Sequence, residues 1–144
     1  MRNWIIGLAA VAAAAGASAQ MAGSSVWQGV YSADQAERGA TVYAARCAAC
    51  HGAALNGTGE APGLVGGEFV SHWDTLTLGD LFDRVRTTMP QNAPQTLTRD
   101  EYADVLAYML KYNGFPQGEK PLDRRSEVLA LISITAQKPE GGGK

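Results

Sequence analysis

The sequence predicts an all-α fold with three to four helices. Three stretches carry apolar residues at helical spacing, residues 34–47, 77–88 and 98–113, and a residue that can cap a helix N-terminus stands at the start of each. The stretch between the first two, residues 52–67, is rich in glycine and poor in helix-forming residues. We therefore expect a long loop between the first and the second helix.

The first helix opens at Ser32, which forms a Ser-x-x-Gln capping-box pattern with Gln35. Ala36, Ala40 and Tyr43 then fall on one helical face. The pattern predicts a helix that buries this face and ends at the first cysteine of the chain.

The second helix starts near Thr77, which suits the N-cap position and has Asp80 three residues later. Pro90 cannot continue a helix, so the helix is predicted to stop with Met89 just past its end. The apolar residues of this helix are Leu78, Leu81, Phe82 and Val85.

The third helix has the clearest boundaries. Thr98 and Glu101 form another capping-box pattern, and Asn113-Gly114 marks the end of the helix. Its inward residues are predicted to be Tyr102, Val105, Leu106, Met109 and Leu110. Further on, residues 128–134 are apolar and are predicted to form either a short strand or a short fourth helix.

The run Cys47-Ala48-Ala49-Cys50-His51 lies at the end of the first helix and indicates the chemistry of the chain. A Cys-x-x-Cys-His run is the attachment signature of c-type haem. Two intervening residues let each thiol reach one vinyl group on the same edge of the porphyrin, and the next residue carries its imidazole beneath the iron. The motif predicts one haem c, bound covalently through Cys47 and Cys50, with His51 as the proximal iron ligand.

Two other kinds of site can contain such a cysteine pair. A dithiol redox motif needs a βαβ context, whereas the flanks of this pair are predicted to be helical. A structural zinc site needs four ligands, but outside the motif the chain offers only His72, and the adjacent Cys50 and His51 would have to meet on one metal. Both interpretations fit the residues less well than haem does.

The N-terminus has the pattern of an export signal. Arg2 precedes an apolar, alanine-rich run, and Ala17-Ser18-Ala19 is a small-x-small cleavage site. An uncleaved anchor is the alternative. The predicted divisions of the chain are a signal peptide at 1–19, an irregular lead-in at 20–33, the haem-binding domain at 34–115, and a C-terminal extension with a disordered end at 116–144.

Charge and hydropathy exclude some classes of partner. The formal net charge is −2 at pH 7 and no basic patch is visible, so nucleic acid is not expected as a partner. No second apolar segment is long enough to span a membrane, so no membrane span is expected after signal cleavage. Covalent haem attachment takes place outside the cytoplasm in bacteria, and the export signal therefore predicts a periplasmic protein.

The order of helix, haem motif, glycine-rich loop, helix, Met-Pro and final helix resembles the class I (mitochondrial-type) monohaem cytochrome c family. The resemblance covers residues 34–115 and implies a small cytochrome c fold whose helices wrap around one haem. It implies that Gly39 packs against an aromatic residue of the last helix, here Tyr108. It also implies that the Pro62 carbonyl holds the imidazole of His51.

The same resemblance implies that Met89, in the run Thr87-Thr88-Met89-Pro90, is the distal iron ligand. Two other methionines of the mature chain are weaker candidates. Met109 lies on the apolar face of the last helix, where it is expected to fill the core. Met21 lies near the mature N-terminus, outside the region of resemblance.

Two residues between the haem motif and Met89 have alternative roles. His72 could serve a bis-histidine iron, but the family has no ligand there, so a position at the surface or near a propionate is expected. Trp73 stands where family members place an aromatic residue that donates to a haem propionate. A plain core tryptophan is the alternative for Trp73.

A histidine and methionine pair raises the reduction potential of haem iron and leaves no vacant position for oxygen or peroxide. The chain also lacks clustered acids, bases or nucleophiles that would indicate catalysis. These features predict an electron carrier rather than an enzyme. Its expected partners are redox proteins, with a dehydrogenase as donor and an oxidase or another cytochrome as acceptor.

Two alternatives remain. The stretches Arg-Thr-Thr-Met-Pro and Asn-Gly-Phe-Pro are similar to those of small cytochromes found with periplasmic quinoprotein dehydrogenases. The chain would then be a dedicated electron-accepting haem subunit of such an enzyme. The other alternative is a haem enzyme or gas sensor whose distal ligand can be displaced.

Overall fold

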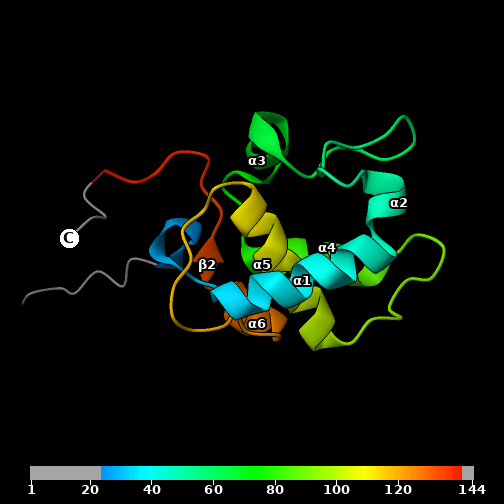
Figure 1. The fold of residues 1–144 in the computed structure, drawn as a ribbon. Helices are drawn as coiled ribbons and strands as arrows, with labels where there is room; N and C mark the ends of the chain where they lie inside the picture. The colour runs from blue at the N-terminus through cyan, green and yellow to red at the C-terminus, as the bar shows by residue number, and fades with distance from the viewer. Residues whose placement is uncertain (1–23, 141–144) are drawn as a thin grey trace, which may run out of the picture.

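The computed structural model describes residues 24–140 and is mostly helical (Figure 1). A two-residue strand and a 3-10 turn precede the first long helix, and a short helix and a second strand close the described chain. The elements in chain order are β1 (Ser24–Ser25), η1 (Val26–Gln28), α1 (Ala33–Arg46), α2 (Ala48–His51), α3 (Gly66–Trp73), α4 (Leu78–Thr88), α5 (Arg99–Tyr112), α6 (Ser126–Leu129) and β2 (Ile132–Ser133). The predicted all-α class is confirmed.

Helices α1, α4 and α5 lie where the sequence predicted helices, and their caps explain why. Thr77 and Asp80 form a complete capping box at the start of α4, and Thr98 and Glu101 form another at the start of α5. Each pair satisfies backbone N–H groups that the first helical turn leaves without partners. The two starts therefore follow from residues three apart in the sequence.

The cap of α1 differs from its prediction in one respect. The Ser32 side chain accepts a hydrogen bond from the Gln35 backbone N–H, as expected of an N-cap. The Gln35 side chain does not return to Ser32. Its amide instead donates to the Leu122 carbonyl at 3.0 Å and accepts from the Leu122 N–H at 2.6 Å, so Gln35 fastens the C-terminal extension to α1.

Helix α3 was missing from the sequence-based prediction, which placed no helix between residues 52 and 77. It starts without a side-chain cap at Val65 and opens with two glycines, so the usual start signal is absent. None of its residues is fully buried. Phe69, Val70 and Trp73 are half-buried and pack against the main core, which holds the helix in place.

Helices α1 and α5 cross in close contact, with α1 in front of α5 in Figure 1. Gly39 makes this possible, because a Cβ atom there would lie 2.9 Å from the Cβ of Tyr108 and closer still to the Asp104 carbonyl. The packing of Gly39 on the helix that carries Tyr108 is therefore confirmed. Across the crossing, the Tyr43 and Tyr108 rings lie 5.3 Å apart.

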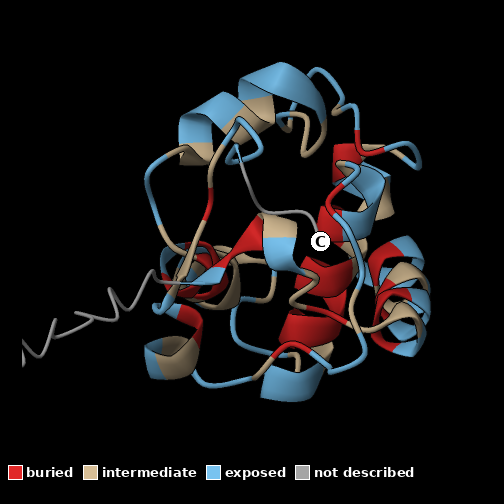
Figure 2. Cartoon of the chain, turned by 90° about the vertical axis from the view of Figure 1, so that its left-hand side faces the viewer, coloured by how far each residue is buried: buried red, intermediate tan, exposed pale blue. Residues whose placement is uncertain are grey.

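Residues before α1 and after α5 share one hydrophobic core with the long helices. Residues 24–28 belong to the lead-in that was predicted to be irregular, yet they form β1 and η1, and β1 pairs in parallel with β2. The apolar stretch 128–134 contains both the end of α6 and β2, so it combines the two predicted alternatives. Figure 2 shows the buried residues gathered along the helices in the middle of the molecule. The core includes Val26, Leu81, Phe82, Leu106, Leu122, Leu129 and Ile134.

The predicted signal peptide and the predicted disordered end both fall outside the described residues. Within residues 24–140, no helix is long and apolar enough to cross a membrane.

Candidate functional site

The cysteine motif is held on a short helical turn at the C-terminal end of α1. Helix α1 ends at Arg46, and the Cys47 N–H still donates to the Tyr43 carbonyl at 2.8 Å. The four-residue helix α2 then carries the motif to His51, whose N–H donates to the Cys47 carbonyl at 2.9 Å. Both cysteines are free thiols, Cys50 exposed and Cys47 partly buried. The pair is thus rigidly mounted at the end of a long helix.

The imidazole of His51 is buried and oriented by Pro62. Its Nδ1 lies 2.9 Å from the Pro62 carbonyl oxygen, which accepts the ring N–H. The side chain is 8% exposed. Because Nδ1 is engaged, the lone pair of Nε2 remains for a metal, and an acceptor behind the ring raises the basicity of that nitrogen. This is the arrangement that the family resemblance implies for a proximal ligand.

A tight loop returns Pro62 to the histidine. The Gly57 N–H donates to the His51 carbonyl at 2.8 Å, and the Leu64 N–H donates to the Leu55 carbonyl at 2.6 Å. Gly57 adopts a φ of 80°, and a Cβ atom there would lie 2.7 Å from both the Ala61 carbonyl oxygen and the Gly63 nitrogen. A glycine is therefore required for the loop to fold back so closely.

Apolar side chains surround the inner cysteine. Tyr43, Leu55, Val105 and Met109 form a buried cluster, and Cys47 packs against it. Burial raises the pKa of the Cys47 thiol to about 11, with a further rise from Cys50 and an opposing effect from Arg46. The thiol is consequently neutral near pH 7. Met109 is a core residue, as predicted, since it is 2% exposed in this cluster.

Met89 occupies the C-cap position of α4, just past the last helical residue, as predicted. Its N–H donates to the Val85 carbonyl at 2.8 Å, and its own carbonyl accepts a hydrogen bond from the Tyr102 hydroxyl at 2.7 Å. The loop that follows Met89 also contacts the end of α1, because a guanidinium N–H of Arg46 donates to Thr96 Oγ1 at 3.1 Å. Met89 therefore starts a loop that is fastened to both α5 and α1.

His72 and Trp73 lie on the last turn of α3. His72 is exposed, in agreement with the expected surface position. Trp73 is half-buried against the main core, with its ring 6.5 Å from that of Phe69 and 5.7 Å from that of His72. Its role as a propionate donor stays a prediction.

The sequence-based prediction missed two tyrosines of the site. The Tyr43 hydroxyl donates to the carbonyl of Gly52 at 2.8 Å, next to His51, and Tyr102 donates to the carbonyl of Met89. Burial raises the pKa of Tyr43 to about 12, so its hydroxyl remains a donor. Both tyrosines were predicted to face inward from their helices. No sequence signal indicates which carbonyl an inward tyrosine will reach.

The residues present fit a covalently held haem. They supply two free thiols on one turn, a buried imidazole with one nitrogen available, an apolar lining and a methionine at a helix end. Within residues 24–140, no group of three or more His, Cys, Asp or Glu side chains could hold a metal ion, which argues against the zinc interpretation. The part played by each residue as a haem ligand stays a prediction.

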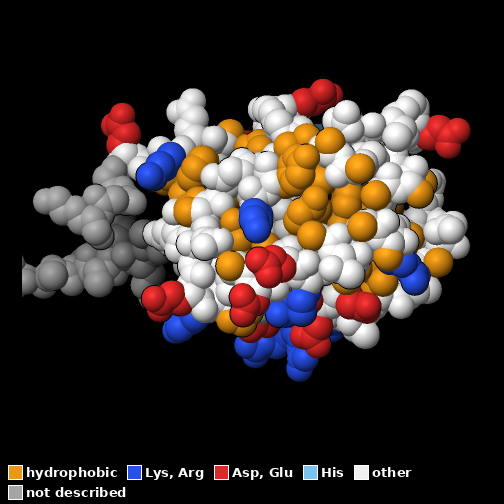
Figure 3. Space-filling model, in the orientation of Figure 1, with side chains coloured by type: hydrophobic (Ala, Val, Ile, Leu, Met, Phe, Trp, Pro, Cys, Tyr) orange, Lys and Arg blue, Asp and Glu red, His pale blue; other side chains and the backbone are white. Residues whose placement is uncertain are grey.

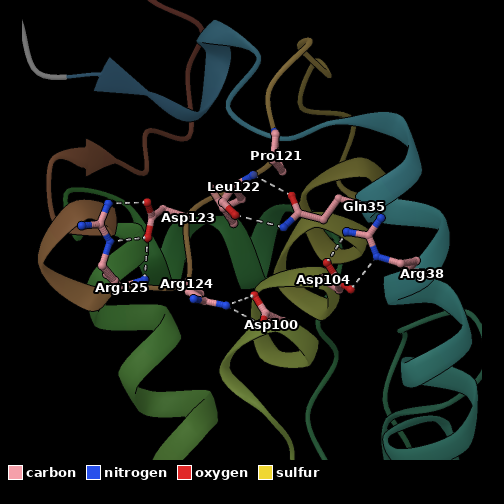
Figure 4. Close-up of a pocket in the computed structure, with 9 residues that line it drawn as sticks. All are labelled: Gln35, Arg38, Asp100, Asp104, Pro121, Leu122, Asp123, Arg124 and Arg125. Carbon is pink, nitrogen blue, oxygen red and sulfur yellow. Dashed lines mark hydrogen bonds and ion pairs between the residues drawn. The ribbon is translucent and has the colours of Figure 1, made fainter.

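A groove elsewhere on the molecule carries polar side chains that already have partners. It lies between α1, α5 and residues 121–125 (Figure 4). Its ion pairs are Arg38 with Asp104 at 2.9 Å, Arg124 with Asp100 at 2.8 Å and Arg125 with Asp123 at 2.8 Å. Hydrogen bonds from Arg125 lower the pKa of Asp123 to about 2. Of these pairs, Arg124 with Asp100 joins the extension to α5, Arg38 with Asp104 joins α1 to α5, and Arg125 with Asp123 lies within the extension. The groove is distinct from the haem motif.

Charged side chains are unevenly spread over the face that carries α1 and α2. Figure 3 shows acidic and basic side chains gathered along its lower edge, and mostly uncharged side chains where α2 lies in Figure 1, with separate acidic side chains at the top and the upper right edge. Exposed residues in or just after the motif include Ala49, Ala53 and Ala54, and the exposed Arg46 directly before Cys47 carries the one charge adjoining the motif. The surface around the motif is therefore largely neutral.

The comparison with protein families accounts for this site. Residues 34–109 match the family described as cytochrome c oxidase, cbb3-type, subunit III. The chain belongs to this family. It is a c-type cytochrome domain, and membership implies covalently bound haem c and a role in electron transfer. A comparison with curated proteins finds no match.

Among solved structures, a chain of the sulfane dehydrogenase SoxCD from Paracoccus pantotrophus has a similar fold. The TM-score is 0.53 and the sequence identity 21%, over 79% of this chain and 61% of that chain. At this identity the likeness shows the fold alone. The cytochrome described here thus spans less than two thirds of the length of that chain.

Proposed function

We propose that this c-type cytochrome carries single electrons through one haem whose axial ligands are His51 and Met89. The observation that carries the proposal is the buried His51 imidazole, with Nδ1 bound to the Pro62 carbonyl, on the same turn as two free thiols. Met89 supports it, since it stands at the end of α4 in a loop tied to α1 and α5. The proposal includes a single haem, because the chain has two cysteines and one haem uses both. It also includes the class I type, which the family resemblance implies.

The bound haem would supply a one-electron iron couple, and the residues would tune and protect it. Pro62 increases the basicity of the proximal imidazole. A methionine sulfur is a soft ligand that favours ferrous iron and raises the reduction potential. If His51 and Met89 both held the iron, no open position would remain for oxygen or peroxide, which would favour electron transfer over catalysis.

We also propose that the protein works in a bacterial periplasm. The support is the pattern of residues 1–19, which resembles a cleaved export signal, together with the extracytoplasmic site of haem attachment. Isolation from cell fractions would test this, with haem-stained protein of the mature size expected in the periplasmic fraction. Recovery of the unprocessed chain from the membrane would indicate an anchor instead.

Replacement of Met89 tests the distal ligand. Ferrous wild-type protein is expected to bind carbon monoxide slowly or not at all near neutral pH, because the iron has no open position. Met89→Leu should keep its covalent haem, bind carbon monoxide rapidly and stoichiometrically, and show a lower reduction potential. Spectroscopy and a redox titration measure these changes.

Met109→Leu is the matched control, because Met109 is buried in the core and is not proposed as a ligand. It should behave as the wild type does. Rapid, stoichiometric binding of carbon monoxide by the wild-type protein would contradict the carrier function and favour a gas sensor or a haem enzyme.

A second candidate function is that of a dedicated electron-accepting subunit of a dehydrogenase. The similarity of two sequence stretches to those of cytochromes found with quinoprotein dehydrogenases favours it. The solved chain of similar fold is itself part of a dehydrogenase, which makes this candidate worth testing. Purification of the native protein under mild conditions separates the two candidates. A stoichiometric complex with a dehydrogenase would support the subunit, and a free monomeric cytochrome would support the diffusing carrier.

A further inference from the structure

Three buried tyrosines each donate a hydrogen bond to a backbone carbonyl. Tyr31 donates to Phe115 at 2.7 Å, Tyr43 to Gly52 at 2.8 Å and Tyr102 to Met89 at 2.7 Å. All three side chains are at most 2% exposed. Two of the three carbonyls belong to the segments that carry the proposed iron ligands.

The Met89 carbonyl is a group that the helix itself cannot satisfy. Met89 is extended, with φ −122° and ψ 150°, so the chain leaves the helical path at this residue. Carbonyl groups at a helix C-terminus have no intrahelical donor. The Tyr102 hydroxyl supplies one, from the first half of α5.

Tyr102 is itself held firmly. Its ring is 1% exposed and lies edge-to-face with Phe82 of α4, with 6.4 Å between the centroids. Helix α5 in turn packs closely on α1 at Gly39, and α1 leads directly into Cys47. The hydroxyl therefore fixes the backbone of Met89 relative to α1, the helix that leads into the haem motif.

We propose that Tyr102 is a positioning residue for the distal ligand, acting through the Met89 backbone. The inference rests on the proposed His/Met function. Tyr43 has the corresponding place on the proximal side, where it holds the carbonyl next to His51. The α1–α5 pair is then the common frame for both ligand segments, and a ligand held in place in advance loses less entropy on binding iron.

The test measures how easily an external ligand displaces the methionine. Ferric wild-type protein and Tyr102→Phe are titrated with imidazole, which competes with Met89 for the iron. Loss of one hydrogen bond that favours the bound position should make imidazole bind about fivefold more tightly to the variant. The far-red absorption band from methionine sulfur bound to ferric iron should also be weaker in Tyr102→Phe than in the wild type, when both are measured at the same temperature.

Tyr31→Phe is the matched control. It removes the hydroxyl oxygen of a buried tyrosine that, like Tyr102, donates to a backbone carbonyl at 2.7 Å. The acceptor of Tyr31 is the Phe115 carbonyl, which does not belong to a segment that carries a proposed iron ligand. Both variants should lose similar stability against denaturant, whereas only Tyr102→Phe should change imidazole affinity. A purely structural Tyr102 would lower stability and leave imidazole affinity unchanged.

The outcomes separate this inference from the proposed function. If the wild type shows the sulfur-to-iron band but Tyr102→Phe binds imidazole as the wild type does, the positioning role is wrong and the His/Met function stands. If the wild type lacks that band, the proposed ligation itself is wrong. Failure of Tyr102→Phe to load haem while Tyr31→Phe loads it would also overturn the inference, because Tyr102 would then be needed for folding or haem loading rather than for positioning Met89.

Discussion

Gly39 allows α1 and α5 to pack closely because it has no Cβ atom. A Cβ atom at this position would lie 2.5 Å from the Asp104 carbonyl carbon and 2.9 Å from the Tyr108 Cβ. Backbone atoms of a packed helix cannot move aside cheaply, so a side chain here must separate α1 from α5. The ligand segments would then lose their common frame.

Gly39→Ala is expected to lower the free energy of unfolding by about 3 kcal/mol, as an overpacked helix contact does. Chemical denaturation of the haem-loaded protein, followed by circular dichroism, measures the loss. Gly67→Ala is the control, because no atom lies within 4 Å of a Cβ built there. That variant should be unchanged or more stable by up to about 1 kcal/mol. Equal effects of the two substitutions would refute the close-contact explanation.

At the scale of elements, the long helices begin where their own residues supply the caps. Thr98 Oγ1 accepts from the Glu101 N–H at 3.2 Å, and the Glu101 carboxylate accepts from the Thr98 N–H at 2.7 Å. The hydrogen bonds that the Glu101 carboxylate accepts from the Thr98 N–H and hydroxyl hold the pKa of Glu101 below its usual value. Helix α3 has no such cap and depends on packing against the core instead.

Thr98→Ala should lower the free energy of unfolding by about 1 kcal/mol at neutral pH, because α5 loses its N-cap. The pKa of Glu101 is lowered by folding, so its contribution is present above the unfolded-state pKa and is lost as the pH falls through the folded-state value. The difference between Thr98→Ala and wild type should therefore shrink on acidification below about pH 4. Denaturant titrations at several pH values measure it. A difference that stays constant or grows toward low pH would count against the capping box.

At the scale of the whole molecule, the C-terminal extension is part of the core. Leu122, Leu129 and Ile134 are at most 4% exposed, and they share a cluster with Val26 and with α4 and α5. Gln35 and the ion pair of Arg124 with Asp100 in Figure 4 fasten the start of the extension to α1 and α5. The extension thus wraps the domain. The limits of the domain drawn from sequence stay a prediction.

Leu129→Ala should lower the free energy of unfolding by about 3 kcal/mol, because it leaves a cavity where a fully buried side chain stood. Leu131→Ala, two residues on, removes a side chain that is 69% exposed and should change stability by less than about 0.5 kcal/mol. Thermal and denaturant unfolding of the two variants measure the contrast. Similar, small effects would mean that the extension packs only loosely.

By itself the sequence determined the haem-attachment motif, the starts of α4 and α5 and the end of α4 before Pro90. Most of these depend on residues a few positions apart, where local geometry decides the outcome. The Pro62 carbonyl was inferred through family resemblance, and the structure places it 2.9 Å from His51 Nδ1.

Only the tertiary structure decided which distant groups meet. Gln35 had two possible partners for its amide, its own N-cap and the extension, and it bonds to Leu122, 87 residues away. The tyrosines were predictable as inward residues, but their acceptors depend on how α5 lies against the end of α4 and how α1 lies against the haem loop. Such pairings follow from the packing of whole helices, which no short stretch of sequence encodes.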